Sequence, residues 1–250
     1  MCFLVPASLV LLSSCRKDPD HPAAQGVAQV PVQLTVKPVW DGAAFDKDSV
    51  YAAAGGQRIQ VTELKFFLAP LELTGPDATA VMFDADLFNV TNGAVHRSLS
   101  VPAGTYHEAH FGLGLPYALN HRDLATIPPN DPTGNNSGMY WSWGTQYRFV
   151  VFSGRFDSDP GGTGIPPYTF DLHTGLDTCY RSRSLPLHVD AMEGDTLRLL
   201  LTVDIARFFT DGTEVLNLSD GAVWHGDPDQ LPLVLKAADL QIKAFSAALE

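Results

Sequence analysis

The sequence predicts an all-β domain, either an antiparallel β-sandwich or a flattened barrel, with long loops that form a site. Apolar residues alternate with polar ones in many short runs, and clusters of glycine, proline, asparagine and aspartate separate these runs. No apolar period of 3.6 residues is sustained, apart from one turn expected near residues 204–209. About 235 residues remain after an N-terminal signal, which is enough for one domain of this class.

The predicted strands follow one another along the chain. Val32, Leu34 and Val36 alternate with polar residues, so the first strand has one buried face. The same alternation recurs at 197–205, where every second residue is leucine, valine or isoleucine. The other strand-like runs are 59–73, 80–90, 95–101, 106–115, 139–152, 185–190 and 233–246.

Two long connections, 120–138 and 157–168, are rich in proline, glycine and asparagine. Connections of this length are uncommon in a compact domain unless they serve a site or are disordered. They flank the aromatic run at 139–152 on both sides. The sequence therefore places the candidate histidines at the ends of that run.

The N-terminus is typical of a bacterial lipoprotein. Residues 1–14 have the apolar composition of a signal peptide, and Leu12-Ser13-Ser14 precedes Cys15 in the pattern that leads to lipidation of the cysteine. A plain cleaved signal is the alternative, and no Lys or Arg opens the segment. Residues 15–29 are then a flexible tether from the lipidated Cys15, and residues 30–250 are the domain. No other run approaches the ~18 apolar residues of a membrane span.

This organisation predicts an extracytoplasmic protein that is held by its lipid alone, at the outer membrane, on the periplasmic or cell-surface side. A net charge of -12 argues against nucleic acid as a partner. Without Cys2 and with Cys15 lipidated, Cys179 is the one remaining cysteine, so no intramolecular disulfide forms. Its thiol is either buried and inert, a metal ligand, or paired with another molecule.

Three segments carry the chemistry of the sequence. The first contains His121, the second is the aromatic run Met139-Tyr140-Trp141-Ser142-Trp143, and the third contains His173. On a regular strand Met139, Trp141 and Trp143 share one face, which brings a thioether beside two indoles. Imidazole nitrogens suit copper, and a thioether is a soft copper ligand, so these residue types point to a copper site.

In this order the three segments resemble those of the MbnP family of copper-associated proteins. Its members carry an Asn-His element, an aromatic Met-x-Trp-x-Trp element, and a His-Gly element followed closely by a cysteine. The resemblance covers roughly residues 30–245, and it includes the segments 58–68, 101–106 and 111–114. Two departures are present. Thr174 separates His173 from Gly175, and Gln146 precedes Tyr147 at a position where relatives usually have a glycine.

The resemblance implies a copper ion bound by His121 and His173, with Trp141 or Trp143 nearby. It also implies that one tryptophan is converted to kynurenine by a separate di-haem cytochrome c peroxidase-like (MbnH-like) partner. The protein is then a binder and a substrate of that partner, not an enzyme. Its role is in copper acquisition or handling.

Other residues are weaker candidates for the metal site. His107 shares a strand face with Ala109 and Phe111 if the strand is regular, and it is either a third ligand or an exposed side chain. Met139 is either a ligand or part of the core. Cys179 lies six residues after His173, which keeps a ligand or near-site role open for it.

Several function classes lack their motifs. The sequence contains no glycine-rich phosphate loop, no G-x-S-x-G elbow and no H-E-x-x-H helix, so hydrolase mechanisms have no support. A structural zinc site would need four ligands, to which a single thiol contributes little. The rival hypothesis is an adhesion or glycan-binding β-sandwich lipoprotein without metal, in which the aromatic strand stacks on sugars.

Overall fold

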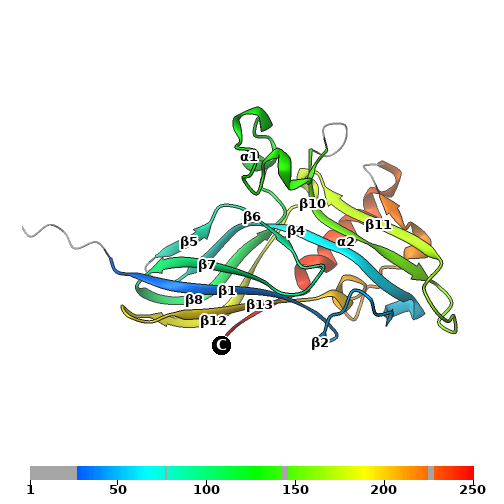
Figure 1. The fold of residues 1–250 in the computed structure, drawn as a ribbon, viewed down its shortest axis with the longest axis horizontal. Coiled ribbons are helices and arrows are strands. Elements are labelled where there is room, and N and C mark those ends of the chain that lie inside the picture. The colour runs from blue at the N-terminus through cyan, green and yellow to red at the C-terminus, as the bar shows by residue number, and fades with distance from the viewer. Residues whose placement is uncertain (1–26, 77, 142–145, 225–227) are drawn as a thin grey trace, which may run out of the picture.

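The computed structural model describes residues 27–76, 78–141, 146–224 and 228–250 (Figure 1). The expected signal peptide, Cys15 and most of the tether lie outside these residues. The described strands form two sheets that stack without closing into a barrel, which confirms the β-sandwich. Within the same residues, no helix has the length and apolar character that a membrane crossing requires.

Strands make up most of the described chain. The strands are β1 (Gln29–Trp40), β2 (Ala43–Ala44), β3 (Tyr51–Ala52), β4 (Arg58–Thr74), β5 (Thr79–Phe83), β6 (Asp86–Asn89), β7 (Val95–Pro102), β8 (Gly104–Leu113), β9 (Tyr140–Trp141), β10 (Gln146–Asp157), β11 (Tyr168–Gly175), β12 (Arg181–Ala191), β13 (Leu197–Asp204), β14 (Val223–Trp224) and β15 (Phe245–Leu249). The α-helices are α1 (Tyr117–Asn120) and α2 (Leu231–Lys243). Short 3₁₀ turns lie at Ala54–Gly56, Leu124–Thr126, Asn135–Ser137, Asp177–Cys179, Ile205–Phe208, Leu218–Asp220 and Pro228–Gln230.

The smaller sheet has the strand order β15-β13-β1-β2, and β7 also pairs with β1. Strands β1 and β13 are parallel, with Val32 opposite Leu197, whereas the sequence predicted antiparallel pairing throughout. The alternation of apolar residues fixes which face of a strand is buried, but it is the same for either strand direction. This sheet is therefore mixed.

The larger sheet is built around β4, a strand of 17 residues. Its order is β12-β8-β4-β10-β11-β14, with β3, β5 and β6 also paired to β4 and β9 paired to β10. One half of β4 pairs with β10, with Lys65 opposite Val151, and the other half pairs with β8, with Thr74 opposite Glu108. The long strand thus joins two regions of the sheet that lie far apart.

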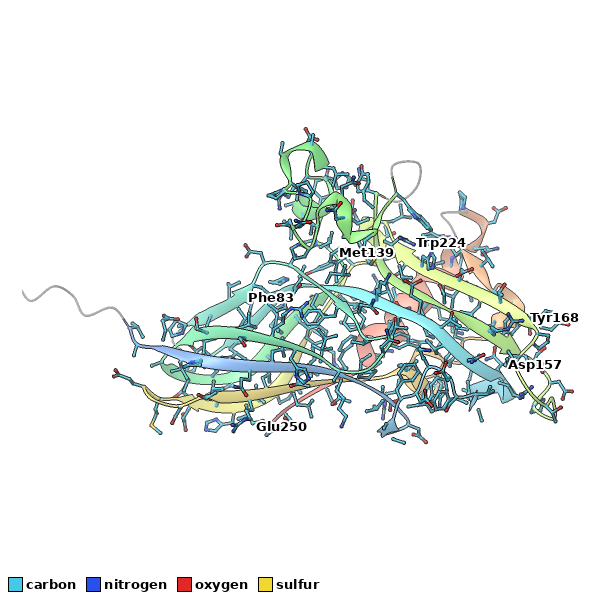
Figure 2. The ribbon with its side chains drawn as sticks, in the orientation of Figure 1. Phe83, Met139, Asp157, Tyr168, Trp224 and Glu250 are labelled. Atoms are coloured by element: carbon cyan, nitrogen blue, oxygen red, sulfur yellow. The ribbon has the colours of Figure 1, made fainter. Side chains whose placement is uncertain are left out.

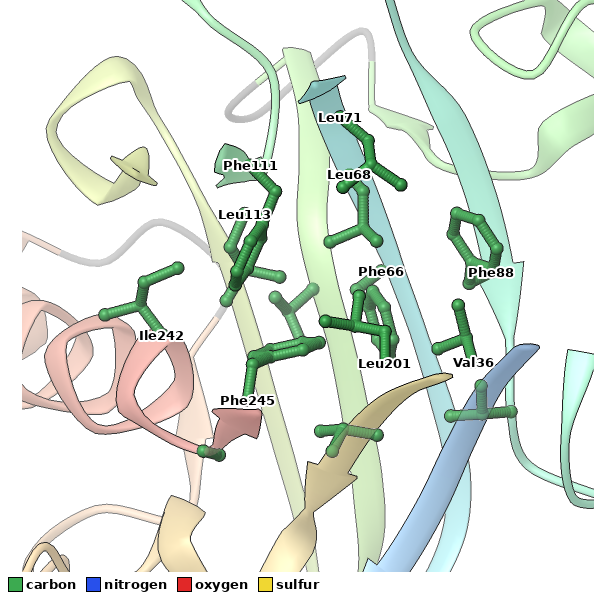
Figure 3. Packing of buried hydrophobic residues seen from close by; sticks show 14 of the residues in the cluster. Val36, Phe66, Leu68, Leu71, Phe88, Phe111, Leu113, Leu201, Ile242 and Phe245 are labelled. Carbon is green, nitrogen blue, oxygen red and sulfur yellow. The ribbon is translucent and has the colours of Figure 1, made fainter. Parts of the chain in front are cut away.

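The main core fills the space between the two sheets. Val36 and Leu201 of the smaller sheet and Phe66 and Leu68 of the larger one all point into it (Figure 3). Phe66 meets the ring of Phe245 edge to face, with centroids 5.4 Å apart. Because successive strand residues face opposite sides, Phe67 and Ala69 point away from this core.

These outward residues belong to a second group of buried side chains, the outer cluster, on the far face of the larger sheet. Two of its members, Met139 and Trp224, lie below the segment that contains α1 (Figure 2). The outer cluster comprises Phe67, Ala69, Leu115, Met139, Tyr147, Phe149, Val151, Cys179, Trp224, Val234 and Ala238. The segment after β8 and helix α2 cover it, so the sheet is buried on both faces here.

Helix α2 corrects the prediction of a strand at 233–246. Leu231, Leu233 and Leu235 occupy every second position, as buried residues do in a strand, and the prediction rested on this spacing. The buried residues of the helix instead recur at spacings of three and four, the period of a helix face. They are Val234, Ala237, Ala238, Leu240, Gln241 and Ile242, and the polar Gln241 interrupts the apolar pattern.

The single strand predicted at 139–152 is also wrong. The chain forms a hairpin in which β9 pairs with β10, with Trp141 opposite Gln146. Met139 precedes β9, so the alternation that would place it beside Trp141 on one strand face does not extend to it. Trp143 lies outside the described residues. The run 80–90 likewise divides into β5 and β6.

Candidate metal site

His121 directly follows helix α1, which begins after Pro116. Its Nε2–H donates a hydrogen bond of 2.9 Å to Oδ2 of Asp177. Its ring stacks on Tyr117, with ring centroids 4.1 Å apart. A short helical turn thus presents this imidazole at the rim of the outer cluster, where about a third of its side chain, 35%, is exposed.

Both carboxylate oxygens of Asp177 accept hydrogen bonds from side chains of consecutive residues. The amide of the buried Asn120 donates to its Oδ1 at 2.9 Å, while His121 donates to its other oxygen. Partial burial raises the pKa of the Asp177 carboxyl, but these two hydrogen bonds outweigh the burial and bring the pKa below its usual value. The carboxylate is therefore charged at neutral pH, and it accepts the hydrogen bond from the imidazole N–H.

His173 is positioned by β11, and only 7% of its surface is exposed. It lies opposite Val151 of β10, a member of the outer cluster, so it faces away from the main core. Its Nε2 is 3.0 Å from the hydroxyl of Ser153, and the carboxylate of Asp171 is 3.8 Å away. An imidazole that is this well buried is fixed in orientation.

Trp141 of β9 is half-buried, and its ring contacts His173 and Arg148. Its ring centroid is 5.4 Å from that of His173, and the guanidinium of Arg148 lies over it at 4.7 Å. Arg148 also donates to the carbonyl of Gly138. Burial lowers the pKa of Arg148, and the charge of Glu63 partly offsets that effect. The indole thus contacts both an imidazole and a cation.

The hairpin brings the two predicted ligands to neighbouring side chains. Gln146 donates from its Nε2 to Nδ1 of His121 at 3.4 Å. Gln146 is the residue opposite Trp141, whose ring contacts His173. Residues directly opposite in an antiparallel pair share a face, so both imidazoles approach the same face of the hairpin. In the described part of the chain no group of three or more His, Cys, Asp or Glu side chains is arranged to hold a metal ion.

Met139 and Cys179 are both buried in the outer cluster, with exposures of 1% and 3%. Met139 packs there among Phe67, Tyr147 and Phe149, as a core methionine does. Burial raises the pKa of the Cys179 thiol, although a backbone hydrogen bond at Gly175 and other contacts lower it in part. The thiol is therefore protonated at neutral pH.

His107 lies elsewhere in the sheet. It precedes Glu108, which pairs with Thr74 of β4, whereas the partner of His173, Val151, pairs with Lys65. Thr74 lies nine residues after Lys65, about 30 Å along a strand. One ion held at His173 is therefore out of reach of His107.

The environment of His107 also differs from the expectation of a regular strand. The pairing of β8 with β12 shifts between Pro186 and Val189, so the alternation breaks at this point. His107 is exposed while Ala109 is buried, and the ring of His107 stacks on that of His188 at 5.4 Å. The structure does not bring His107 to His121 or His173.

Four residues around the candidate ligands were not predicted: Asn120, Gln146, Arg148 and Asp177. Asn120 belongs to the Asn-His element of the resemblance, and Asp177 lies four residues after His173; these were the signals available for the two residues. Gln146 and Arg148 reach the site only because the hairpin folds back after β9. Their roles depend on a pairing register that the sequence pattern does not contain.

Comparison with known proteins identifies the architecture. The family model MbnP matches residues 29–224. The solved structure of MbnP from Methylosinus trichosporium is similar with a TM-score of 0.50 and 17% sequence identity, over 89% of this chain and 99% of that chain. At this identity the structural likeness establishes a shared fold. No curated protein matches the chain.

Proposed function

Because the chain belongs to the MbnP family, we propose that it is an extracytoplasmic lipoprotein that binds copper for acquisition or handling. Membership of the family implies a protein associated with methanobactin. In this proposal His121 and His173 bind the copper ion, and the protein is a binder and not an enzyme. Copper is its cargo.

The observation that carries the proposal is that the two imidazoles contact two residues that lie opposite each other in the β9–β10 hairpin. The ring of His173 lies against Trp141, and His121 contacts the residue opposite Trp141. Imidazole is a good copper ligand, and two nitrogen donors are adequate for Cu(I), which accepts low coordination numbers. The described donors therefore fit a Cu(I) ion better than a structural zinc ion, which takes four ligands.

We further propose that Trp141 or Trp143 is oxidised to kynurenine by a di-haem partner. Indole is readily oxidised, and the aromatic amine of kynurenine adds a nitrogen donor for copper. Of these two tryptophans the structure describes Trp141, which is half-buried beside His173. The partner removes four electrons in total, water supplies the oxygen atoms, and the C2 carbon of the indole leaves as formate.

The test is metal analysis of the mature protein co-expressed with the di-haem partner and purified without chelators. We expect bound copper in the unchanged protein and its loss in a His121→Ala/His173→Ala variant. Peptide mass mapping should show one tryptophan heavier by the exchange of one carbon for one oxygen. His96→Ala/His188→Ala is the matched control, because both of these histidines are exposed and lie outside the site.

Copper that persists at the same affinity in the first double variant contradicts the proposal. Absence of copper from the unchanged protein would favour the glycan-binding alternative. One face of the Trp141 indole is already covered by the Arg148 guanidinium, which makes it a poor open platform for sugar stacking.

A further inference from the structure

Both ring nitrogens of His121 have hydrogen-bond partners, and the two partners differ in kind. Nε2 lies 2.9 Å from a carboxylate oxygen of Asp177, and Nδ1 lies 3.4 Å from the amide nitrogen of Gln146. A charged carboxylate only accepts hydrogen bonds, and an amide NH₂ only donates them. The proton of a neutral His121 therefore sits on Nε2, and the lone pair is on Nδ1.

We propose that Asp177 and Gln146 together make Nδ1 of His121 the atom that binds the metal ion. Asp177 is the positioning residue that keeps the proton on Nε2. Gln146 occupies the Nδ1 lone pair with its N–H, and the incoming ion displaces it. This inference rests on the proposed function, because it names the donor atom of the same site. A carboxylate behind a ligating imidazole fixes the ring and raises its basicity.

The backbone supports this assignment. Three non-glycine residues in the described chain have a left-handed φ: Asp41, Gln146 and Leu176. Gln146 has φ of 67°, and Leu176, with φ of 69°, immediately precedes Asp177. Such conformations are unfavourable for residues with a side chain, and they persist where the surrounding structure imposes them. Both contacts of His121 are thus made by, or directly after, a strained residue.

The side chains support it as well. Oε1 of Gln146 is buried and accepts no hydrogen bond from any described residue, so the contact of its Nε2 with Nδ1 of His121 is the hydrogen bond that the structure gives this side-chain amide. Asn120 fixes Asp177 by donating to its second oxygen at 2.9 Å, and it accepts from the backbone N–H of Tyr147 at 3.4 Å. The carboxylate therefore has one orientation to offer His121.

The first experiment uses the metal-free, full mature chain labelled with ¹⁵N, and it records long-range ¹H–¹⁵N spectra of the histidine rings. We expect His121 in the Nε2–H tautomer, with an Hε2 proton that exchanges slowly because it is hydrogen-bonded. Asp177→Ala should make that proton exchange too fast to observe. Asp171→Ala is the matched control and should leave it unchanged, since Asp171 lies beside the other histidine.

The second experiment adds silver(I), a diamagnetic ion that shares the ligand preferences of Cu(I) and couples magnetically to a bound ¹⁵N. Coupling is expected on Nδ1 of His121. Gln146→Ala should bind silver about fivefold more tightly, since the ion no longer displaces one weak hydrogen bond. Gln60→Ala, a change on β4, is the control and should leave the affinity unchanged.

The outcomes separate this inference from the proposed function. A metal-free His121 in the Nδ1–H tautomer, or silver coupling on Nε2, overturns the inference while His121 remains a ligand. Silver that couples to neither nitrogen of His121 overturns the proposed function, and the metal step of the inference falls with it.

Discussion

Trp141 has a strongly polar environment for an indole. The Arg148 guanidinium lies 4.7 Å from its ring centroid, a favourable contact between a cation and the electron-rich face. The same cation opposes any positive charge that develops on the ring, so removing an electron from Trp141 is harder than from an indole without a cation. Oxidation of this residue needs a strong oxidant, which agrees with the haem partner that we propose.

Cys179 should be nearly inert in the folded protein. Its thiol is buried and its pKa is raised, so little thiolate is present near pH 8 and reagents do not reach it. We expect its labelling by a maleimide to be on the order of 100-fold slower than in the urea-unfolded chain. Mass spectrometry of the peptide that contains Cys179 measures this rate.

Ser100→Cys places a thiol at an exposed position of β7 and serves as the control for labelling. Equal labelling rates at the two positions under native conditions would mean that Cys179 is accessible.

At the level of single residues the sequence identified side chains by their chemistry but not by their partners. His121 and His173 could be selected because imidazole is a metal ligand and because both lie in family-like segments. The contacts of His121 with Asp177 and Gln146 depend on a strained backbone and a hairpin register. No local pattern in the sequence encodes either feature.

The C-terminus of α2 is capped by a side chain from another element. The Arg183 guanidinium of β12 donates to the carbonyls of Ile242, Lys243 and Phe245 at 3.3, 3.0 and 3.2 Å. The last carbonyls of a helix lack partners within the helix and carry a partial negative charge. Arg183→Met should therefore lower the free energy of unfolding by about 1–3 kcal/mol.

The unfolding free energy is measured by urea denaturation, with an unchanged slope required for the comparison. Arg207→Met is the control, because the Arg207 side chain is 60% exposed and its ion pair with Asp204 is 3.6 Å long. If Arg183→Met lowers the free energy of unfolding no more than Arg207→Met does, the hydrogen bonds of Arg183 to the helix terminus do not stabilise the protein.

A pH effect is expected at the turn that holds α2. The pKa of Asp211 lies well below its usual value, chiefly because Lys243 donates to it, with help from Glu214 and Thr213. A lowered pKa in the folded state means that the carboxylate stabilises the fold above the unfolded pKa of about 4, and that this contribution is lost as the pH falls further.

Urea midpoints between about pH 7 and pH 2.5 should therefore converge for the unchanged protein and Asp211→Asn as the pH falls. The variant should be the less stable of the two at neutral pH. Glu193→Gln, at an exposed turn, should parallel the unchanged protein. A gap between Asp211→Asn and the unchanged protein that stays constant through this range would contradict the assignment.

The strands were predictable from the sequence where only one face of the strand is buried. The alternation in β1 and β13 fixed both strands closely, because their outer faces meet solvent. Helix α2 was missed because its first leucines mimic a strand and because it buries the polar Gln241. The pairing of β9 with β10 was missed because the aromatic run is typical of one continuous strand.

Both sheets contribute side chains to the main core. Leu201 is 1% exposed, and in β13 it lies between Val36 of β1 and Ala247 of β15. Leu201→Ala should lower the free energy of unfolding by about 2–5 kcal/mol, through lost burial and the cavity that remains. Thermal and urea unfolding measure the loss, and Val81→Ala, at a position that is 51% exposed, should change stability little.

The architecture as a whole was predictable only as a class. Many short alternating strands indicate two stacked sheets, and two stacked sheets are present. Strand order and direction follow from contacts between distant segments, such as the parallel pairing of β1 with β13. The outer cluster was not foreseen, because residues such as Phe67 and Phe149 look like strand residues of the main core until a second covering layer is known.

The position of β1 has a consequence for how the protein is made. This strand, near the start of the described chain, is flanked by β7 and by β13, which begins at Leu197. Its neighbour β13 is therefore synthesised more than 150 residues later, so the sheet cannot close while the chain is still emerging from the ribosome. Pairings this distant in sequence slow folding. The unpaired first strand must stay protected from other chains until nearly the whole polypeptide has been synthesised.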